Sequence, residues 1–299
     1  MFPFKPAICY SGYRHGQNPR TETYPSDAEV LEDLLILIKH FSYIRMYDVS
    51  EHAKSVLRVI TANKLPLKVL LGVEVKGEVS NPNCPWGGVY TDEELVEHKA
   101  FNIAQLDQVA QLGNQYQDIV LGISIGNENM AHWHPNKVTP ESLVEHAKIL
   151  KTKTSLPLTF CEGAYEWRNQ GQELAKVVDF ISIHVYPLWQ RVPYHEAVKL
   201  TTDQYYETKA AFPDKPVIFT EFGWTTSATE NMNLDEVNEE LHKGYLNQMI
   251  EWSNEHQVTM FIFEAFDEPW KGGDNPLEAE KHWGIYNVDR TPKSWIAQF

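Results

Sequence analysis

Eight short runs of apolar and β-branched residues recur along the whole chain, separated by stretches with helical periodicity. Runs that are hydrophobic almost throughout are typical of parallel strands covered on both faces. A regular alternation of strands and helices favours a parallel sheet with right-handed crossovers. The eight expected strands are Ala7–Tyr10, Tyr43–Tyr47, Leu67–Val75, Ile119–Ile125, Leu158–Cys161, Val178–Val185, Val217–Thr220 and Val258–Phe263.

Several helical stretches begin with recognisable start signals. Ser26 stands three residues before Glu29, and Thr91 stands three residues before Glu94, which is the capping-box pattern. Thr139 precedes a proline at the first helical position, where proline is favoured, and Ser50 is a further candidate N-cap. The expected helices are Pro25–His40, Ser50–Ala62, Thr91–Gln115, Thr139–Thr152, Glu173–Val177, Tyr194–Phe212, Leu234–Glu255 and Pro292–Phe299.

Eight strand-and-helix units in 299 residues fit an α/β fold of one kind, a single closed (β/α)₈ TIM barrel. The chain contains neither a linker-like segment nor a low-complexity tract, so we expect residues 1–299 to form one catalytic domain. The alternative is a doubly wound open sheet. Such a sheet normally has a glycine-rich phosphate loop after its first strand, and Tyr10–Gly16 lacks that spacing.

Polar side chains stand at the end of every expected strand. In a barrel of this kind the carboxyl ends of the strands carry the active site, so this pattern predicts a site at the barrel mouth. The residues concerned are Tyr13, Arg14, His15, Arg45, Tyr47, Asp48, Glu74, Asn127, Glu128, Glu162, His184, Tyr186, Glu221, Glu264, Asp267 and Glu268.

Tryptophan is concentrated just after the strands, and this indicates the class of ligand. The apolar C–H face of a sugar ring stacks on an aromatic plane, while its hydroxyls need charged and amide partners. We therefore predict a saccharide-binding cleft, although one or two of these rings could simply fill the barrel mouth. The tryptophans that follow strands are Trp86, Trp133, Trp167, Trp189, Trp224, Trp270 and Trp283.

Net charge and cysteine content exclude other classes. With 26 basic and 41 acidic residues the chain carries a net charge of −15, which disfavours nucleic acid as a partner. Cys9, Cys84 and Cys161 match no metal or redox spacing, so we expect unpaired thiols without a cofactor or a metal. We also expect no membrane span and a monomer. The N-terminus lacks a signal-peptide pattern, yet a periplasmic or extracellular place is expected for the mature chain.

Two glutamates stand out among the residues at strand ends. Glu128 follows Asn127 at the fourth strand, and Glu221 ends the seventh strand in the run V-I-F-T-E-F-G-W. Strands four and seven lie roughly opposite each other in an eight-stranded barrel, so the two carboxyls could stand about 5 Å apart, the spacing of retaining glycosidases. Glu221 is the better nucleophile if Tyr186 and Lys271 keep it ionised, and Glu128 is the better acid/base.

The motifs resemble those of family 17 glycoside hydrolases, the β-1,3-glucanases and β-1,3-glucan glucosyltransferases of the retaining (β/α)₈ superfamily. The resemblance covers nearly the whole chain and is nearer to the bacterial members than to the plant enzymes. The motifs are Y-S-G-Y-R-H-G at 10–16, I-R-M-Y-D at 44–48, L-G-V-E at 71–74, G-N-E at 126–128, H-V-Y-P at 184–187, T-E-F-G-W at 220–224 and F-D-E-P-W-K-G at 266–272.

The resemblance implies an acid/base role for Glu128 and a nucleophile role for Glu221. It also implies that Tyr186 hydrogen-bonds near the nucleophile and that Asn127 contacts the sugar. Supporting residues of the eighth-strand loop in the family match Glu268, Lys271 and Glu280 here. Trp283 stands where plant members usually have Phe, and the long Trp270–His282 loop leaves endo or exo action open.

The other substrate-binding candidates come from the ends of the remaining strands. Arg45 and Asp48 are either sugar contacts or an ion pair at a strand end, and the same alternatives hold for Glu74. Glu162 and Glu166 are candidates for a subsite. The full set of candidates besides the residues implied by the resemblance is Arg45, Tyr47, Asp48, Glu74, Glu162, Trp133, Trp167, Trp189, Trp224 and Trp270.

Hydrolysis of β-1,3-glucan is the first functional hypothesis, with transglycosylation by the same two glutamates as the alternative. A metal-dependent sugar isomerase is a rival from another class, and a non-catalytic glycan-binding barrel is a third possibility. The chain has both glutamates, which such a binding barrel would normally lack. The residues that could ligate a divalent ion in the isomerase reading are Glu128, His132, His134, His184 and Asp267.

Overall fold

In the computed structural model, which describes residues 2–230 and 232–294, eight parallel strands close into a barrel in sequence order. β1 pairs with β2 on one side and with β8 on the other, and this pairing closes the sheet. The predicted (β/α)₈ TIM barrel is confirmed, and each strand overlaps the residue range that was predicted for it. The strands are β1 Ala7–Cys9, β2 Tyr43–Arg45, β3 Lys68–Leu71, β4 Val120–Asn127, β5 Leu158–Gly163, β6 Ile181–Val185, β7 Val217–Phe222 and β8 Met260–Ile262.

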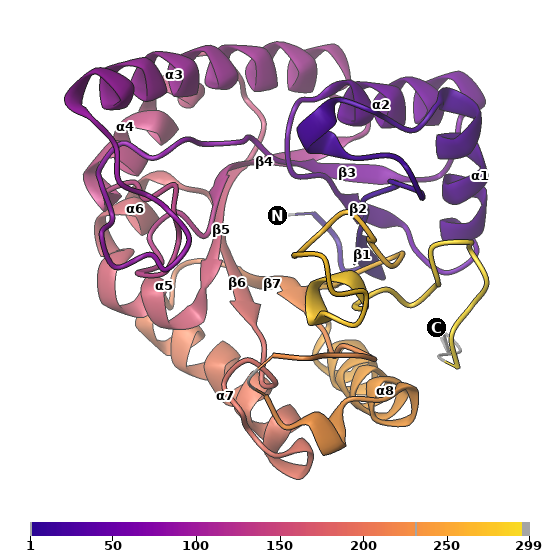
Figure 1. Ribbon diagram of the computed structural model, residues 1–299. Helices are drawn as coiled ribbons and strands as arrows, with labels where there is room; N and C mark the ends of the chain where they lie inside the picture. Colours follow the sequence, from indigo (N-terminus) through magenta and orange to yellow (C-terminus); the bar gives the residue numbers. More distant parts are fainter. Residues whose placement is uncertain (1, 231, 295–299) are drawn as a thin grey trace.

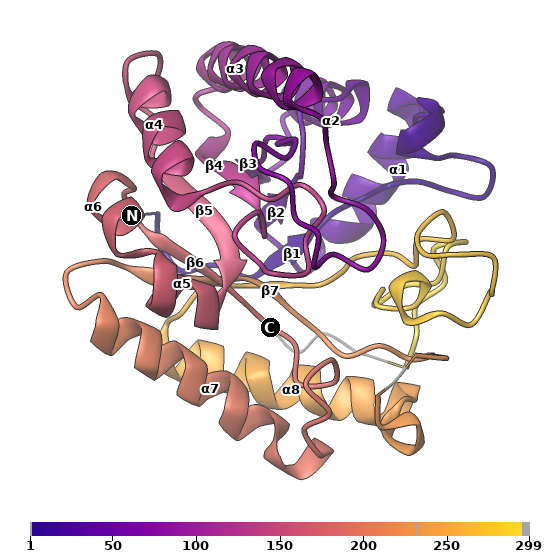
Figure 2. The same cartoon turned by 60° about the vertical axis from the view of Figure 1, so that its left-hand side comes forward.

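The helices form a ring outside the strands, as Figure 1 shows from one end and Figure 2 from a turned view. Apolar side chains between the strands and this ring, and inside the barrel, make one continuous core. The helices are α1 Asp27–Leu37, α2 Glu51–Asn63, α3 Asp92–Gln115, α4 Pro140–Lys151, α5 Ala164–Gln170, α6 Gln172–Val177, α7 Tyr194–Ala211 and α8 Glu239–His256, with 3₁₀ helices η1 Pro19–Thr21, η2 Leu234–Glu236 and η3 Ala279–Lys281.

Three of the four predicted N-caps make a capping hydrogen bond through their side chains. The Ser26 and Thr91 side chains each accept a hydrogen bond from the backbone N–H of the glutamate three residues on. The side chain of that glutamate accepts a hydrogen bond from the backbone N–H of the cap residue, so the two capping boxes are confirmed. Thr139 accepts from the Ser142 N–H at the start of α4. Ser50 takes the N-cap position of α2, but its side chain makes no capping bond.

Two predicted helices need correction, and one helix was not predicted. The stretch 234–255 is not one helix, because Asn238 caps a new start and separates η2 from α8. The short helix α5 was not expected. Instead of starting a helix, Pro292 forms a β-bridge with Tyr286, while 295–299 lie outside the described residues. Within the described ranges, no helix is both long and apolar enough to span a membrane.

Candidate active site

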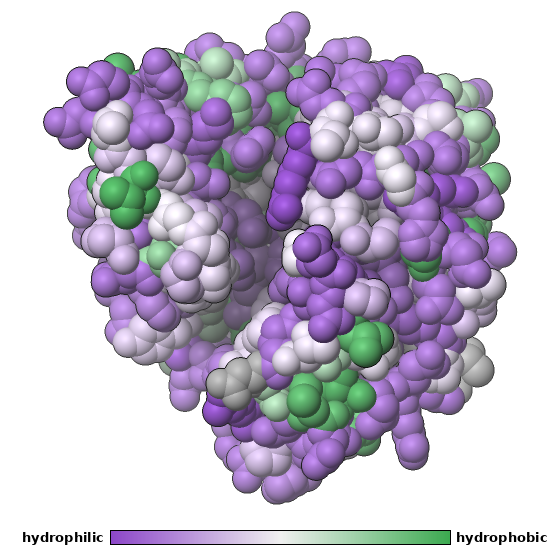
Figure 3. Space-filling model, in the orientation of Figure 1, coloured by the Kyte–Doolittle hydropathy of each residue, from purple (hydrophilic) through white to green (hydrophobic). Residues whose placement is uncertain are grey.

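A large cleft opens at the carboxyl ends of the strands, as the architecture requires. Its volume is about 1280 Å³, and its walls are side chains from the ends of the strands and the loops that follow them. Figure 3 shows this hollow near the middle of the face that looks down the barrel. The chemistry of the site therefore depends on which side chains these strand ends present.

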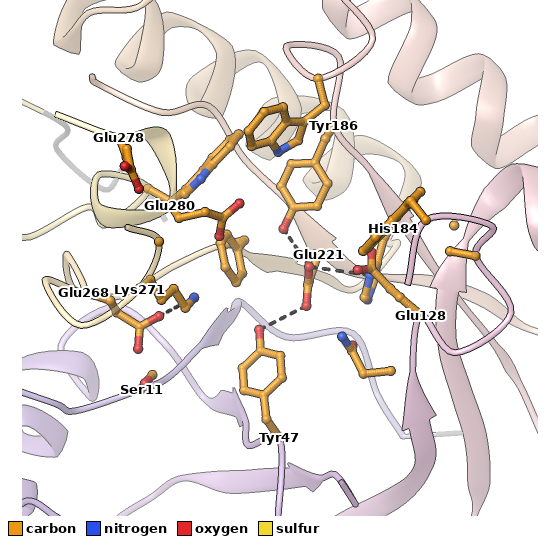
Figure 4. Close-up of a pocket in the computed structure, with 18 of the residues that line it drawn as sticks. Ser11, Tyr47, Glu128, His184, Tyr186, Glu221, Glu268, Lys271, Glu278 and Glu280 are labelled. Carbon is orange, nitrogen blue, oxygen red and sulfur yellow. Dashed lines mark hydrogen bonds and ion pairs between the residues drawn. The ribbon is translucent and has the colours of Figure 1, made fainter. Parts of the chain in front are cut away.

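Glu221, in β7, lies at the floor of this cleft, and four side chains converge on its carboxylate. One oxygen accepts hydrogen bonds from Arg45 Nη1 at 2.5 Å and from the Tyr47 hydroxyl at 3.1 Å. The other oxygen accepts from the Tyr186 hydroxyl at 2.6 Å and lies 3.5 Å from His184 Nδ1. Figure 4 shows Tyr47, Tyr186 and His184 pointing toward this carboxylate. The group is held in place and has two cationic side chains beside it.

Glu128 follows the last residue of β4 and has a left-handed backbone with a φ of 55°. A non-glycine residue in that region is strained, and such strain persists only where the surroundings enforce it. The Glu128 N–H donates to the Cys161 carbonyl at 2.9 Å, and the preceding Asn127 N–H donates to Asn129 Oδ1 at 2.9 Å. The strained turn directs the Glu128 carboxylate into the cleft, where its Oε1 lies 2.8 Å from His184 Nδ1.

The two glutamates face each other across His184. One oxygen of Glu128, one ring nitrogen of His184 and one oxygen of Glu221 all lie within 4.8 Å of one another. Retaining glycosidases have carboxyl groups about 5–5.5 Å apart, whereas inverting enzymes leave about 6.5–9.5 Å for a water molecule. The observed spacing falls on the retaining side of that division.

The charges around Glu221 determine its ionisation. Burial by itself would raise the pKa of Glu221, but the charges of His184 and Arg45 and the Tyr186 hydrogen bond lower it below its ordinary value. Burial opposes the charge on His184 as well, yet Glu221 and Glu128 raise the pKa of its imidazole to about 10. At neutral pH an ionised Glu221 therefore lies beside an imidazolium and a guanidinium.

A second charged cluster lies beside this pair, on the loop after β8. Lys271 forms ion pairs with Glu268 and, at 3.2 Å, with Glu264, and the Trp270 indole N–H donates to Glu268 at 2.9 Å. Burial and the charge of Glu268 raise the pKa of Glu264, while Lys271 holds the pKa of Glu268 below its ordinary value. Lys271 was predicted to keep Glu221 ionised. It makes no direct bond to that carboxylate, because its ammonium group pairs with Glu264 and Glu268.

The tryptophans divide into cleft and core residues. Trp133, Trp189 and Trp270 line the cleft as predicted, together with Trp86 and Trp283. The prediction is wrong for Trp167 and Trp224, which are fully buried away from the cleft. The indole N–H of Trp167 donates to the Ser182 carbonyl, and that of Trp224 donates to the Glu236 carbonyl, so both rings are satisfied inside the core.

A comparison with known protein families agrees with this geometry. Residues 7–284 match the family model described as the BtgE/BtgC glycoside hydrolase domain. The chain belongs to this family. Membership confirms the resemblance to glycoside hydrolases that the strand-end motifs indicated, and it makes the cleft the site of a glycoside hydrolase domain.

Curated relatives share about a quarter of their residues with this chain. The "Glucan 1,3-beta-glucosidase" of Arthroderma benhamiae is 26% identical over 286 residues, which are 89% of this chain and 83% of the relative. The "Probable glucan endo-1,3-beta-glucosidase btgC" of Aspergillus clavatus is 24% identical over 303 residues, 91% of this chain but 39% of the relative. The chain thus spans well under half of that second protein.

Solved structures show the same fold at low identity. An endo-laminarinase from Formosa Hel1_33_131 has a TM-score of 0.79 at 24% identity, covering 95% of this chain and 83% of its own. A Rhizomucor miehei β-1,3-glucanosyltransferase in complex with laminaritriose has a TM-score of 0.76 at 18% identity, covering 97% and 96%. At these identities the likeness concerns the barrel and not the individual side chains.

Arg45 supports the site from below and does not contact the cleft. It is buried, and its guanidinium donates to Glu221, to the Thr220 carbonyl at 3.1 Å and to Asn127 Oδ1 at 2.5 Å. The prediction of a sugar contact is therefore corrected, because the side chain ties the ends of β4 and β7 together. Tyr47, Asp48 and Asn127, by contrast, do line the cleft.

The metal-ligand set of the rival hypothesis is not assembled. Asp267 pairs with Lys293 at 2.7 Å, and His134 Nδ1 accepts the Asn136 N–H at 3.1 Å. Of the five proposed ligands, only Glu128 and His184 meet, and Glu221 is a third side chain in that group and its second oxygen donor. A divalent ion there would lie beside the Arg45 guanidinium and would have to displace the proton of an imidazole with a pKa of about 10. This donor set does not suit a metal.

Two further carboxylates, which the sequence suggested as sugar contacts, have other surroundings in the structure. Glu162 reaches the cleft wall, but both its oxygens accept backbone hydrogen bonds at 2.8 Å, from Met130 and Gly163. It therefore braces the turn that follows Glu128. Glu74 is exposed and does not line the cleft, so its predicted sugar contact is corrected. Glu268, Lys271 and Glu280 line the cleft as the resemblance implied.

Sequence reasoning missed part of the site. His184 was predicted at a strand end of the site, but the only role considered for it was that of a metal ligand, whereas it joins the two catalytic candidates. The cleft rim also includes residues of long loops, namely Gln190, Thr229, Glu230 and Glu278. A histidine two residues before Tyr186 on a strand shares that residue's face, and this period-2 relation was the available signal for His184. Nothing in the local sequence marks the four rim residues.

Proposed function

We propose that this chain cleaves β-1,3-glucosidic bonds of laminarin-type glucans with retention of anomeric configuration. The observation that carries the proposal is the Glu128–His184–Glu221 arrangement, with donor atoms within 4.8 Å of one another at the cleft floor. The substrate class is supported by the names of the relatives, which include a glucan 1,3-β-glucosidase and an endo-laminarinase. All eight strand-and-loop units contribute to the cleft, so we propose one catalytic domain over residues 1–299.

In the first step the Glu221 carboxylate attacks the anomeric carbon of the bound glucosyl unit. The bond from that carbon to the glycosidic oxygen breaks as the bond to Glu221 forms, and Glu128 delivers its proton to the departing oxygen. The hydroxyls of Tyr47 and Tyr186 and the guanidinium of Arg45 orient the nucleophile. Their role is to hold one carboxylate oxygen toward the sugar while keeping the group ionised.

In the second step Glu128 acts as a base. It removes a proton from a water molecule whose oxygen then bonds to the anomeric carbon, and the bond to Glu221 breaks. The products are a β-configured sugar and a free nucleophile, with the proton back on Glu128. Two inversions at the same carbon give overall retention.

Transglycosylation is a second candidate function with a structural argument of its own. If the hydroxyl of another glucan replaces water, the same step lengthens the chain and does not hydrolyse it. Aromatic rings line the cleft on the loops after several strands, namely Trp86, Trp133, Trp189 and Trp270, so an acceptor sugar has surfaces to bind. The glucanosyltransferase with the same fold makes this reaction chemically reasonable.

The test is a time course on laminarioligosaccharides with anomeric configuration followed by proton NMR. Retention with shorter products supports hydrolysis, and products longer than the starting oligomer support transfer. The nucleophile is tested by Glu221→Ala, which should lower kcat by several orders of magnitude, each tenfold being about 1.4 kcal/mol of barrier. Glu251→Ala, an exposed carboxylate on α8, is the matched control. Inverted products, or full turnover by Glu221→Ala, would refute the proposal.

A further inference from the structure

The segment 72–91, between β3 and α3, and the loop after β4 together form a wall of the cleft, to which the first contributes Trp86 and the second Trp133. The Asn81 side-chain amide of the first segment donates to the carbonyls of His132 and His134, at 2.7 and 2.9 Å, in the loop after β4. The Glu78 N–H donates to the Lys137 carbonyl at 2.9 Å as well. Two loops far apart in sequence are thereby joined into one fixed surface.

This wall presents two indole rings to the cleft. Trp86 remains 65% exposed although it is a large apolar side chain, and its ring centroid lies 6.4 Å from that of Trp133 at an angle of 51°. Gly87 and Gly88, with φ of 135° and 87°, turn the chain immediately after Trp86. Both rings line the same cleft as the two glutamates, but Trp86 lies at its open rim while Glu221 is buried at its floor.

We propose that Trp86 and Trp133 form a remote subsite that binds a neutral glucosyl unit of a long glucan, away from the bond being cleaved. This inference rests on the proposed function and adds the part of the substrate that the catalytic pair does not contact. An exposed indole in a fixed wall offers a sugar a flat apolar surface at little cost in conformational entropy. The surface is continuous with the catalytic cleft, so one chain can occupy both.

The charges that line the same cleft agree with a neutral occupant. His132 also lines the cleft beside Trp133, and the cleft wall includes the carboxylates of Asp48, Glu162 and Glu166. An anionic sugar would be repelled by such a wall, whereas the hydroxyls of glucose can hydrogen-bond to it. Covering one exposed indole face removes on the order of 60 Å² of apolar surface from water, which corresponds to about a tenfold gain in binding.

The test compares kcat/KM on laminarihexaose and laminaritriose for the wild type and for Trp86→Ala, Trp86→Phe and Trp133→Ala. We expect the hexaose-to-triose ratio to fall about tenfold in the two alanine variants and by less in Trp86→Phe, which keeps a smaller ring. Tyr206→Ala removes an exposed aromatic residue of α7 outside the cleft, and its ratio should equal that of the wild type. Thermal unfolding of each variant checks that the wall is intact.

The outcomes separate this inference from the proposed function. If the wild type cleaves both oligosaccharides and the ratio of Trp86→Ala stays within twofold of the wild type, the subsite is refuted and the proposed function stands. An equal loss on both substrates also refutes it, because a remote subsite acts on the longer chain. If the wild type cleaves neither oligosaccharide, both proposals fall.

Discussion

Replacing His184 with asparagine tests the charge arrangement of the site directly. The asparagine amide can still donate from the position of Nδ1, so the variant removes a positive charge while keeping a hydrogen-bond donor. Because His184 Nδ1 lies 3.5 Å from Glu221, two full charges there interact by about 5 kcal/mol at an effective dielectric constant near 20 and by about 1 kcal/mol in bulk water. These limits correspond to roughly one to three and a half pH units in the ionisation of Glu221.

The direction of the effect follows from the sign of each shift. The charges of His184 and Arg45 hold the pKa of Glu221 low against burial, and the attacking form is the ionised one. In His184→Asn only Arg45 remains, so the pKa rises and the acid limb of kcat/KM moves to higher pH. With Arg45 still 2.5 Å away, we expect a displacement of about one to two pH units, near the lower limit above.

The assay is a pH profile of kcat/KM on a β-1,3-oligosaccharide, with unfolding curves as a check on the fold. His242→Asn is the control, because burial lowers the pKa of that α8 histidine to about 3 and leaves it uncharged at working pH. Its acid limb should coincide with that of the wild type. An acid limb in His184→Asn that stays in place or moves to lower pH would show that the imidazole carries no charge in the resting site.

Three further predictions concern buried carboxyls. Glu264→Gln should unfold at a higher temperature than the wild type, by a margin that widens as pH rises above about 4.5, because burial and Glu268 raise the pKa of the natural carboxyl. A constant margin would contradict this. Glu162→Gln should lower kcat about tenfold with little change in KM. Glutamine has one acceptor oxygen where Glu162 has two, so it can hold the N–H of Met130, in the turn after Glu128, or that of Gly163, but not both. An effect on KM alone would count against bracing. Glu78→Gln should remove up to about 3 kcal/mol of stability at pH 7, because burial raises the pKa of Glu78 but its hydrogen bonds with His146, Asn102 and Ser142 together outweigh burial and lower the pKa to about 2. In denaturant titrations the wild type should lose this advantage as pH falls from about 4.5 to 2, and a difference that does not depend on pH would refute the assignment.

The sequence predicted the barrel because its information is local. Each strand is a short apolar run, and each run is followed by helical periodicity, so the order of elements needs no long-range contact. The ends of β4 and β7 follow from the same pattern, which is why Glu128 and Glu221 could be paired before their distance was known. The ends of the strands were predicted less accurately than their order. For example, β7 continues two residues beyond its expected end and includes Glu221 itself.

Partners within the site could not be predicted in the same way. Arg45 and Glu221 are 176 residues apart in sequence, and they meet only because closure of the barrel brings β2 and β7 to one floor. Lys271 was expected at Glu221, but an ammonium group pairs with the nearest carboxylates, and Glu268 is only three residues away. The sequence shows which groups a strand end offers but not which of them a side chain will reach.

The burial of the tryptophans could not be predicted from the local sequence either. Trp167 and Trp189 both follow a strand by a few residues, yet one is fully buried and the other is 40% exposed. The difference arises because β5 passes directly into α5, and a residue one turn into that helix faces the barrel wall. After β6 the chain continues as a loop up to Tyr194, so Trp189 has no helix to direct it inward.

The charge balance of the site also suggests why one glutamate can serve both steps of the proposed reaction. In the resting site the negative charge of Glu221 balances Arg45 at 2.5 Å and contributes to balancing the His184 imidazolium at 3.5 Å. Once Glu221 is bonded to the sugar its charge is gone, and Glu128 is then the carboxylate that remains in contact with the His184 imidazolium. The proton of Glu128 leaves with the departing sugar at that moment, and the imidazolium 2.8 Å away stabilises the carboxylate that results. That carboxylate is the base that the second step requires, so the His184 imidazolium can support first the nucleophile and then the base without any movement of the backbone.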